Sequence, residues 1–284
     1  MKKNLSIVMI LVLTVCTAAF GGGKKETPSS STPAAAHAAP VELVVFAAAS
    51  MTETLKDVAV LYKAVAPNVN LVFNFDSSGT LKTQIQQGAD CDVFISAGQL
   101  QVNQLDITAD PSVNKEKLDF VLQGTRVDLL ENRVTLCVPS GNPAGIKNFD
   151  DLADKLKNAK ILFAMGNSDV PVGQYTQRIL AYYKLDEKAL VAAGKITYGS
   201  NVKEITTQIS ENSVSCGVIY CTDAFSAKLK VLDYATAAMC GQIIYPAAVI
   251  KTGKNAAAAK AFLDYLRMPA ATTVFEKVGF AAVR

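Results

Sequence analysis

Residues 41–66 read VELVVFAAASMTETLKDVAVLYKAVA. The first six, Val41–Phe46, are a compact apolar run of the kind that forms a buried strand. Small residues follow at 47–50, and beyond them apolar residues recur at spacings of three and four. The members of this helical pattern are Leu55, Val58, Ala59, Tyr62 and Val65. The stretch therefore predicts a strand, a narrow connection, and a helix over residues 51–66.

The same alternation of strands and helices continues along the chain. Short apolar runs typical of strands cover residues 69–75, 93–96, 134–138, 161–165, 216–220 and 243–250. Helical spacings of apolar residues cover 173–184, 202–212 and 254–267. Strands that alternate with helices over short connections predict an α/β fold with largely parallel sheets.

Composition and charge exclude several classes of function. Of the 284 residues 50% are hydrophobic and 19% are charged, which is enough for a core and argues against global disorder. The net charge of +3 comes from the N-terminal end, because four lysines and one glutamate precede Val41. The neutral remainder lacks the basic surface of a nucleic-acid binder. The single histidine, His37, argues against a Ser-His-Asp triad and a multi-histidine metal site.

The N-terminal residues predict export. Residues 1–21 have the pattern of a signal peptide, in which two lysines precede an apolar run of about eleven residues that is too short to span a bilayer. The sequence LTVC at 13–16 is also similar to a lipoprotein box, in which Cys16 would carry the lipid. The protein is therefore expected in the periplasm or on the outer face of the cell membrane. Residues 22–40, rich in Gly, Ser, Thr, Pro and Ala, predict a flexible tether.

The five cysteines of the body are interpreted as buried or free thiols. Several of them lie in or beside apolar strand-like runs, where cysteine acts as a small hydrophobic residue. Cys216 and Cys221 are about 16 Å apart along an extended chain, which is too far for a disulfide. A zinc site is not expected, because the body has no histidine and no Cys-x-x-Cys pair.

Four expected helix starts are built from small, hydroxyl or amide residues. They are 47–50 (AAAS), 76–80 (DSSGT), 167–173 (NSDVPVG) and 199–204 (GSNVKE). The spacing from Ser50 to Glu53 and from Asn201 to Glu204 is that of a capping box. First-turn N–H groups are unpaired and lie at the positive end of the helix dipole, so each start is a ready anion site. In open α/β sheets such loops gather where ligands bind.

Ordinary capping explains any one of these starts, because Ser and Asn are common N-caps. Two observations favour a shared site instead. Residues 47–50 and 77–79 lack bulky side chains, so a ligand can approach the backbone. The chain also has no phosphate-binding loop of the form Gly-x-x-x-x-Gly-Lys-Ser/Thr, so neutral donors alone would hold the anion.

Seven motifs in register carry a family resemblance. They are 46–52 (FAAASMT), 74–81 (NFDSSGTL), 92–97 (DVFISA), 170–173 (VPVG), 217–220 (GVIY), 222–224 (TDA) and 245–249 (YPAAV). In this order they resemble the periplasmic molybdate-binding proteins of ABC importers, and the resemblance covers about Val41 to Arg284. It implies a two-lobed fold of the periplasmic-binding-protein type II class, with two hinge crossings and a tetrahedral oxyanion in the cleft.

The resemblance also implies the ligands of the oxyanion. The two serine hydroxyls fall on Ser50 and Ser78, two backbone N–H groups on Val172 and Val202, and the tyrosine hydroxyl on Tyr220. The molybdenum would be bound as molybdate, without direct ligation of the metal by the protein, and no cofactor is implied. Donors alone suit an oxyanion that carries no proton, such as molybdate, tungstate or sulfate, whereas hydrogen phosphate prefers a carboxylate acceptor.

The expected lobes are residues 41–130 plus 244–284 and residues 131–243. The chain is expected to cross between them at 134–139 and 243–249, because each segment contains a proline and a proline disfavours the centre of a sheet. A monomer that captures molybdate, and tungstate with it, would deliver the ion to a membrane permease driven by a cytoplasmic ATPase. It would perform no chemistry on the ligand, and nucleic acid is not an expected partner.

Three alternatives stay open at this point. The ligand can be sulfate or phosphate, with Asp76 or Asp169 either supplying an acceptor or lying as solvated loop charges. A secreted hydrolase would use Ser50 or Ser78 as its nucleophile, but it would lack a histidine base. An oxyanion sensor that feeds a membrane kinase would use the same cleft.

Overall fold

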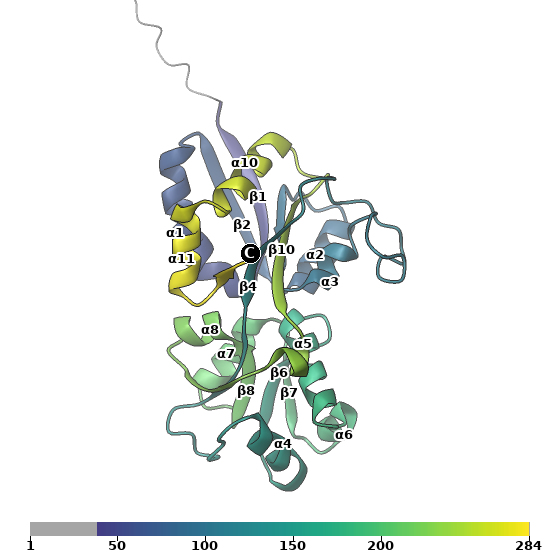
Figure 1. Cartoon of the computed structure of the whole chain (residues 1–284), viewed down its shortest axis with the longest axis vertical. Helices are drawn as coiled ribbons and strands as arrows, with labels where there is room; N and C mark the ends of the chain where they lie inside the picture. Colours follow the sequence, from purple (N-terminus) through teal and green to yellow (C-terminus); the bar gives the residue numbers. More distant parts are fainter. Residues whose placement is uncertain (1–38, 284) are drawn as a thin grey trace, which may run out of the picture. The chain divides into compact units, whose positions relative to one another are not determined.

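The computed structural model describes residues 39–283. The expected signal peptide and nearly all of the expected tether lie outside the described residues. The described chain forms two β-sheets with helices packed around each (Figure 1). No helix among residues 39–283 combines the length and the apolar character that a membrane crossing needs.

The first sheet and its helices are called lobe 1. Its strands follow the order β11-β4-β10-β3-β1-β2. Their bounds are β1 Val41–Ala48, β2 Val69–Asp76, β3 Val93–Ile95, β4 Val127–Asn132, β10 Ile243–Val249 and β11 Ala281–Ala282. The helices of lobe 1 are α1 Thr52–Val65, α2 Ser78–Gln86, α3 Gln99–Asn103, α10 Ala256–Leu266 and α11 Pro269–Lys277, and a single 3₁₀ turn, η1 Ala49–Met51, leads into α1.

The second sheet and its helices are called lobe 2. Its strands follow the order β7-β6-β8-β5-β9. Their bounds are β5 Val134–Val138, β6 Phe163–Gly166, β7 Ile196–Gly199, β8 Cys216–Tyr220 and β9 Lys230–Tyr234. The helices of lobe 2 are α4 Phe149–Asn158, α5 Pro171–Tyr182, α6 Glu187–Ala192, α7 Val202–Ser210, α8 Cys221–Ser226 and α9 Ala237–Cys240.

The stretch at 41–66 folds as its pattern predicts. Strand β1 lies between β2 and β3, and its alternate residues Leu43 and Val45 are fully buried. Helix α1 buries Leu55 and Val58 on the face that the three-and-four spacing defines. Tyr62, one turn further, packs its ring against an aromatic ring of α10, with the centroids 5.0 Å apart. The apolar faces of strand and helix therefore share one core.

The expectation of largely parallel sheets is wrong, because both sheets are mixed. In lobe 1 the strand β10 runs antiparallel to both β3 and β4. In lobe 2 the strand β5 runs antiparallel to both β8 and β9. The reason lies in the crossings: β5 and β10 each enter a sheet from the other lobe, so they run against the strands of the βαβ units that surround them.

The expected positions of the crossings are also wrong. Strands β5 and β10 are interior strands of the two sheets, and the chain changes lobe at Arg133 and at residues 241–242. Pro139 follows the end of β5, so no ladder bond is lost there. Pro246 is tolerated inside β10 because the register with β4 shifts between Tyr245 and Pro246. At such a bulge the missing N–H of proline removes no ladder bond.

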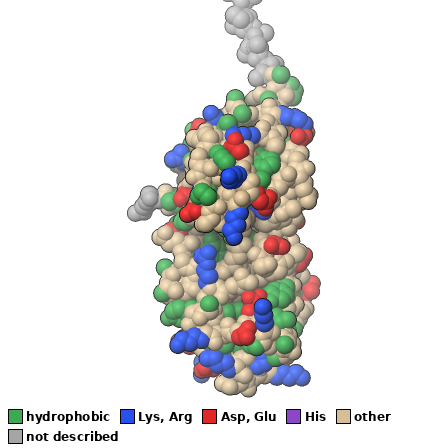
Figure 2. Space-filling model, turned by 90° about the vertical axis from the view of Figure 1, so that its right-hand side faces the viewer, with side chains coloured by type: hydrophobic (Ala, Val, Ile, Leu, Met, Phe, Trp, Pro, Cys, Tyr) green, Lys and Arg blue, Asp and Glu red, His purple; other side chains and the backbone are tan. Residues whose placement is uncertain are grey.

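The surface and the cysteines agree with the sequence analysis. On the face shown in Figure 2, lysine and arginine side chains are interspersed with aspartate and glutamate, without one extended basic area. The five cysteines of the described chain are free and buried. Burial raises the pKa of the Cys137 thiol to about 11 and that of Cys240 to about 11. These thiols act as small core side chains.

Candidate binding site

A small cavity lies between the two lobes, with a volume of about 10 Å³. Lobe 1 supplies η1, the ends of β1, β2 and β3, and the start of α2, whereas lobe 2 supplies the starts of α5 and α7 and the end of β8. The lining residues are Ala48, Ala49, Ser50, Asp76, Ser77, Ser78, Ala97, Val170, Pro171, Val202 and Tyr220. The helix starts singled out in the sequence therefore meet at one place.

Four of the five expected ligand residues line this cavity: Ser50, Ser78, Val202 and Tyr220. The fifth, Val172, is fully buried and belongs to the hydrophobic core instead. Helix α5 presents Val170 and Pro171 to the cavity, because it begins at Pro171 and Val172 is one position further round its first turn. A role for the backbone N–H of Val172 stays a prediction.

Two of the helix starts are capped by the side chain just before them. The Ser77 hydroxyl accepts the Thr80 N–H at 3.1 Å at the start of α2. The Asn201 side chain accepts the N–H groups of Lys203 at 3.0 Å and Glu204 at 3.2 Å at the start of α7. Both caps leave the first helical residue, Ser78 or Val202, with an N–H that has no partner within its helix. The positive end of each helix dipole also lies there.

The expected capping box at the first helix does not form. Ser50 lies inside the turn η1, and the residue before α1 is Met51, which makes no side-chain cap. Glu53 pairs with Lys203 instead. The 3₁₀ turn tightens the entry to α1, so the hydroxyl of Ser50 stands at the cavity rather than over the first turn of α1.

The hydroxyl of Ser78 is prepared as a donor. Its oxygen accepts the N–H of Ala97 at 2.9 Å, and the residue is fully buried. An oxygen that already accepts one hydrogen bond still carries its own proton, which is free to donate into the cavity. Ala97 thus sets the direction of this donor.

Tyr220 brings a second kind of donor from the end of β8. Its hydroxyl makes one long contact, 3.5 Å to the carbonyl oxygen of Ala97. Burial raises the pKa of Tyr220 well above its usual value, with Tyr245 and Tyr175 adding to the effect. The side chain therefore stays a neutral phenol that can donate its proton to a bound acceptor.

Sequence reasoning missed two polar residues behind Ser50. The hydroxyl of Tyr245 in β10 lies 2.9 Å from the hydroxyl of Ser50, and the amide of Asn132 in β4 donates to Tyr245 at 3.1 Å. Both side chains are buried. Tyr245 begins the YPAAV motif, which was the only signal available for it, and nothing local in the sequence marks Asn132.

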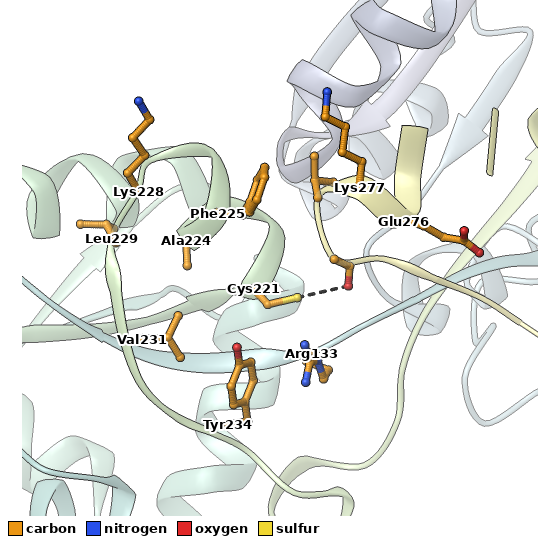
Figure 3. A pocket seen from close by; sticks show the side chains of 12 residues that line it. Arg133, Cys221, Ala224, Phe225, Lys228, Leu229, Val231, Tyr234, Glu276 and Lys277 are labelled. Atoms are coloured by element: carbon orange, nitrogen blue, oxygen red, sulfur yellow. Dashed lines mark hydrogen bonds between the residues drawn. The ribbon is translucent and has the colours of Figure 1, made fainter. Parts of the chain in front are cut away.

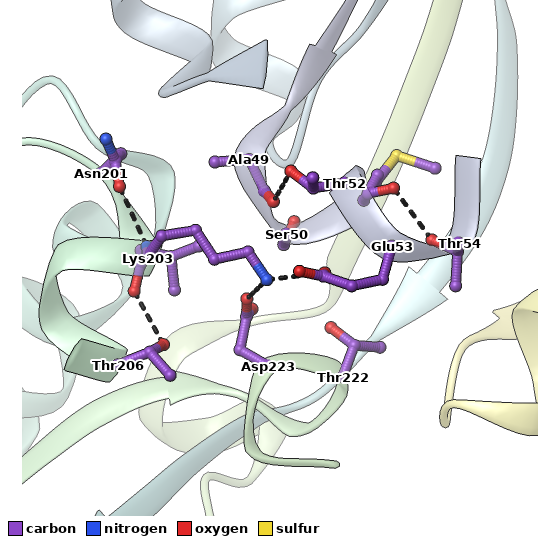
Figure 4. A network of polar contacts seen from close by, with 12 residues as sticks. Ala49, Ser50, Thr52, Glu53, Thr54, Asn201, Lys203, Thr206, Thr222 and Asp223 are labelled. Atoms are coloured by element: carbon purple, nitrogen blue, oxygen red, sulfur yellow. Dashed lines mark hydrogen bonds and ion pairs between the residues drawn. The ribbon is translucent and has the colours of Figure 1, made fainter. Parts of the chain in front are cut away.

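A charged network joins the lobes beside the cavity (Figure 4). The ammonium of Lys203 in α7 lies 2.7 Å from the carboxylate of Glu53 in α1 and 3.1 Å from that of Asp223 in α8. Burial raises the pKa of Asp223 to about 6, although the nearby Lys203 lowers it. Burial lowers the pKa of Lys203, but the two carboxylates outweigh it and the net shift is upward. The network ties lobe 1 to lobe 2 and leaves no unbalanced lysine at the cavity.

The two aspartates that the sequence left open lie in different places. Asp76 lines the cavity, where one carboxylate oxygen accepts the Ser77 N–H at 2.7 Å and the Asn201 amide at 3.4 Å. Asp169 is exposed and borders a separate cleft on the outside. Asp76 is therefore the carboxylate that can influence which ion enters.

A larger hollow near the hinge holds none of the expected ligand residues (Figure 3). It lies beside Arg133, whose guanidinium stands 4.3 Å over the ring of Tyr234. Cys221 lines it and donates to the carbonyl oxygen of Gly279 at 3.4 Å. Its walls are mostly apolar side chains, with a few separate charged ones, and no hydrogen-bond donors converge in it. The small cavity is therefore the better candidate for the binding site.

Two α/β lobes that enclose one small cavity of hydrogen-bond donors define a solute-binding protein of the two-lobed class. Comparison with known families agrees. Residues 43–281 match the family described as bacterial extracellular solute-binding protein, and the chain belongs to that family. The expected two-lobed fold and the expected class of protein are therefore confirmed.

Individual relatives cover most of the chain. YvgL of Bacillus subtilis, assigned to the substrate-binding lipoproteins of ABC transporters, is 32% identical over 244 residues, which is 85% of this chain and 87% of that protein. The molybdate-binding protein ModA of Escherichia coli is 31% identical over 242 residues, 84% and 88% of the two chains. The structure of the Azotobacter vinelandii periplasmic molybdate-binding protein is similar in fold, with a TM-score of 0.72, 21% identity and coverage of 85% and 100%.

Replacing Asp223 by asparagine is expected to change the pH dependence of stability. A carboxyl whose pKa is raised by folding contributes stability fully below its unfolded pKa of about 4, and this contribution is lost as the pH rises through about 6. We compare the free energy of unfolding of Asp223→Asn with that of the unchanged protein. The variant's value minus the unchanged protein's value should rise by at most about 3 kcal/mol between pH 4 and pH 7. Urea unfolding at several pH values measures it. Asp57→Asn, an exposed carboxylate on α1, is the control, and a difference that stays constant with pH would contradict the prediction.

Proposed function

We propose that this protein captures molybdate, and tungstate with it, for import by an ABC transporter. The relatives that bear the name molybdate-binding protein support the choice of ion, and the cavity supports it independently. Its volume of about 10 Å³ is far below the range of roughly 300–1,000 Å³ usual for organic ligands. Such a space excludes a sugar or a peptide and leaves a small ion, admitted by a slight parting of the two lobes, as the ligand.

The observation that carries the proposal is the character of the lining. Ser50, Ser78 and Tyr220 bring hydroxyl donors, and the helix starts bring backbone N–H groups. The described residues around the cavity include no lysine or arginine. Oriented dipoles in a dry cavity can balance a divalent anion without a formal positive charge. We assign the ligand contacts to Ser50, Ser78, Tyr220 and the backbone N–H groups of Val172 and Val202.

A phosphate binder is the second candidate, and Asp76 is the observation that favours it. A carboxylate in the cavity wall could accept the proton that hydrogen phosphate carries. One oxygen of Asp76 already accepts from Ser77 and Asn201, and the other stays able to accept. We place molybdate first because the other polar side chains of the lining are hydroxyl donors, and the ion panel below decides.

The transport role supplies the remaining partners. A permease in the membrane and a cytoplasmic ATPase would receive the loaded protein, which we expect to act as a monomer. Residues 1–21 would direct export, either as a cleaved signal or through a lipid on Cys16, and residues 22–40 would tether the body outside the cell membrane.

Titration with four oxyanions tests the proposal. Molybdate and tungstate are expected to bind at least about tenfold more tightly than sulfate, a difference of about 1.4 kcal/mol. Phosphate should bind weakly, because the other polar groups that line the cavity besides Asp76 are donors. Calorimetry on the exported body measures all four. Phosphate binding as tight as molybdate binding would reject the proposal and assign the acceptor role to Asp76.

Removing single hydroxyls tests the residue assignment. Ser50→Ala, Ser78→Ala and Tyr220→Phe each take one donor from a charged oxygen, which is worth about 1.5–3 kcal/mol. Molybdate affinity should fall by roughly ten- to a hundredfold in each variant, with little change in the melting temperature of the free protein. Ser210→Ala is the control, because the Ser210 hydroxyl bonds the Thr206 carbonyl within α7 and does not line the cavity. Full affinity in all three variants would refute the assignment.

Gly79→Ala tests whether closure of the lobes is needed. A Cβ added at Gly79 in α2 would overlap the backbone carbonyl oxygen of Asp169 in lobe 2. The variant should therefore fold but resist closure, so that it binds molybdate more weakly and shrinks less on binding. Small-angle scattering with and without molybdate measures the radius of gyration. Ser210→Ala is again the control, because the Ser210 hydroxyl bonds only the Thr206 carbonyl within α7; equal compaction in the Gly79 and Ser210 variants would count against the prediction.

A further inference from the structure

A directed chain of hydrogen bonds ends at the cavity. It runs from the amide of Asn132 at the end of β4 to the hydroxyl of Tyr245 in β10, 3.1 Å away, and from there to the hydroxyl of Ser50, 2.9 Å away. The three side chains are 0–5% exposed. All three belong to lobe 1, and Asn132 also contacts Cys221 and Thr222 of lobe 2.

The orientation of the Asn132 amide is fixed by its neighbours. The backbone N–H of Arg133 points at one end of the amide at 2.8 Å, and the thiol of Cys221 points at the same end at 3.1 Å. A backbone N–H can only donate, so this end must be the carbonyl oxygen. The NH₂ group therefore faces the other way, toward the hydroxyls of Thr222 and Tyr245.

The orientation of the Asn132 amide also fixes the donor and acceptor roles of the Tyr245 hydroxyl. Burial raises the pKa of Tyr245 well above its usual value, so the side chain keeps its proton. Its oxygen accepts the hydrogen of Asn132, and its single proton is left for Ser50. In a reversed chain the oxygen of Tyr245 would accept from both Asn132 and Ser50, and its own proton would have no hydrogen-bond acceptor among residues 39–283.

Ser50 is therefore left with one possible role at the cavity. Its oxygen accepts from Tyr245, and within residues 39–283 its hydroxyl has no other hydrogen-bond partner. The proton of Ser50 consequently faces the cavity. If this hydroxyl turned round to donate to Tyr245, the proton of Tyr245 would lose its acceptor.

We propose that Asn132 and Tyr245 are positioning residues that hold Ser50 as an obligate donor and so select oxyanions that carry no proton. The inference rests on the proposed function, since it concerns the same cavity. It explains selectivity against hydrogen phosphate by residues that do not themselves touch the ligand. A freely rotating serine could turn its proton away and accept the proton of hydrogen phosphate, whereas a serine held by Tyr245 must still place its own proton on an acceptor in the cavity.

Two substitutions act on this chain without touching the cavity. Tyr245→Phe removes the hydroxyl that orients Ser50. Asn132→Asp keeps the shape and replaces the donor by an acceptor, so that Tyr245 is expected to donate to the new carboxylate and to accept from Ser50. Ser50 would then present its oxygen, not its proton, to the ligand. Tyr62→Phe is the matched control, because Tyr62 is buried among aromatic rings of α10 away from the cavity.

The experiment measures affinities for molybdate, sulfate and inorganic phosphate at pH 8 by calorimetry. Tyr245→Phe is expected to weaken molybdate and sulfate by roughly three- to tenfold and phosphate by less, so that the preference over phosphate narrows. Asn132→Asp should reduce the preference for molybdate and sulfate over phosphate further. A purely structural effect would weaken the three ions by the same factor, and an unchanged preference in both variants would overturn the inference.

A second measurement separates this inference from the proposed function. If the unchanged protein binds none of the three ions, the proposed function fails, and the chain can still be read in ligand-free crystals by neutron diffraction. Deuterium between the oxygens of Tyr245 and Ser50, bound to Tyr245, supports the chain. Deuterium on Ser50 directed at Tyr245 overturns it. The same measurement decides the question if either variant fails to fold.

Discussion

Unpaired backbone N–H groups at the starts of α2, α5 and α7 are the constraint on which the rest of the site depends. Such groups cannot be satisfied within their own helices, and leaving them buried without a partner is costly. Here the starts of these helices come from both lobes and meet at one cavity. A small ion with acceptors on every side is a partner that can satisfy both sets together. On the proposed function, binding of the ion and closure of the lobes would be one event.

The other features of the site serve this arrangement. Small residues at η1 and at Gly79 let backbone approach backbone across the gap. The nearest lysine, Lys203, is neutralised by Glu53 and Asp223 and does not line the cavity. Without a free cation the site cannot hold anions by net charge alone. Affinity must come from the number and direction of donors, which depend on the shape of the ion and on its protons.

Most of the site could be predicted from the sequence, because its motifs are local. Ser50, Ser78 and Val202 each lie where a strand passes into a helix, and small or capping residues mark such places. Tyr245 and Asn132 could not be found in this way. They lie 195 and 82 positions from Ser50, and only the pairing of β4 with β10 brings them together. The capping box at Ser50 was also not predictable locally, because Ser50 lies in η1 and Glu53 pairs with Lys203, 150 positions away.

The fold was predictable to a similar degree. Periodicity identified strands and helices at 41–66 and elsewhere, since burial of one face is a local pattern. The directions of β5 and β10 were not predictable, because they depend on where the chain passes between lobes. The proline rule misplaced the crossing at Pro246 because a bulge in the ladder with β4 absorbs the missing N–H.

The pairing of Asn132 with Ile243 in neighbouring strands has a mechanical consequence. It places the two connections between the lobes, at Arg133 and at residues 241–242, side by side. A single flexible connection would leave the lobes three rotational degrees of freedom, whereas two adjacent connections leave little more than one axis. The lobes can then rotate relative to each other about little more than this one axis. Little rotational entropy is therefore lost when they come together.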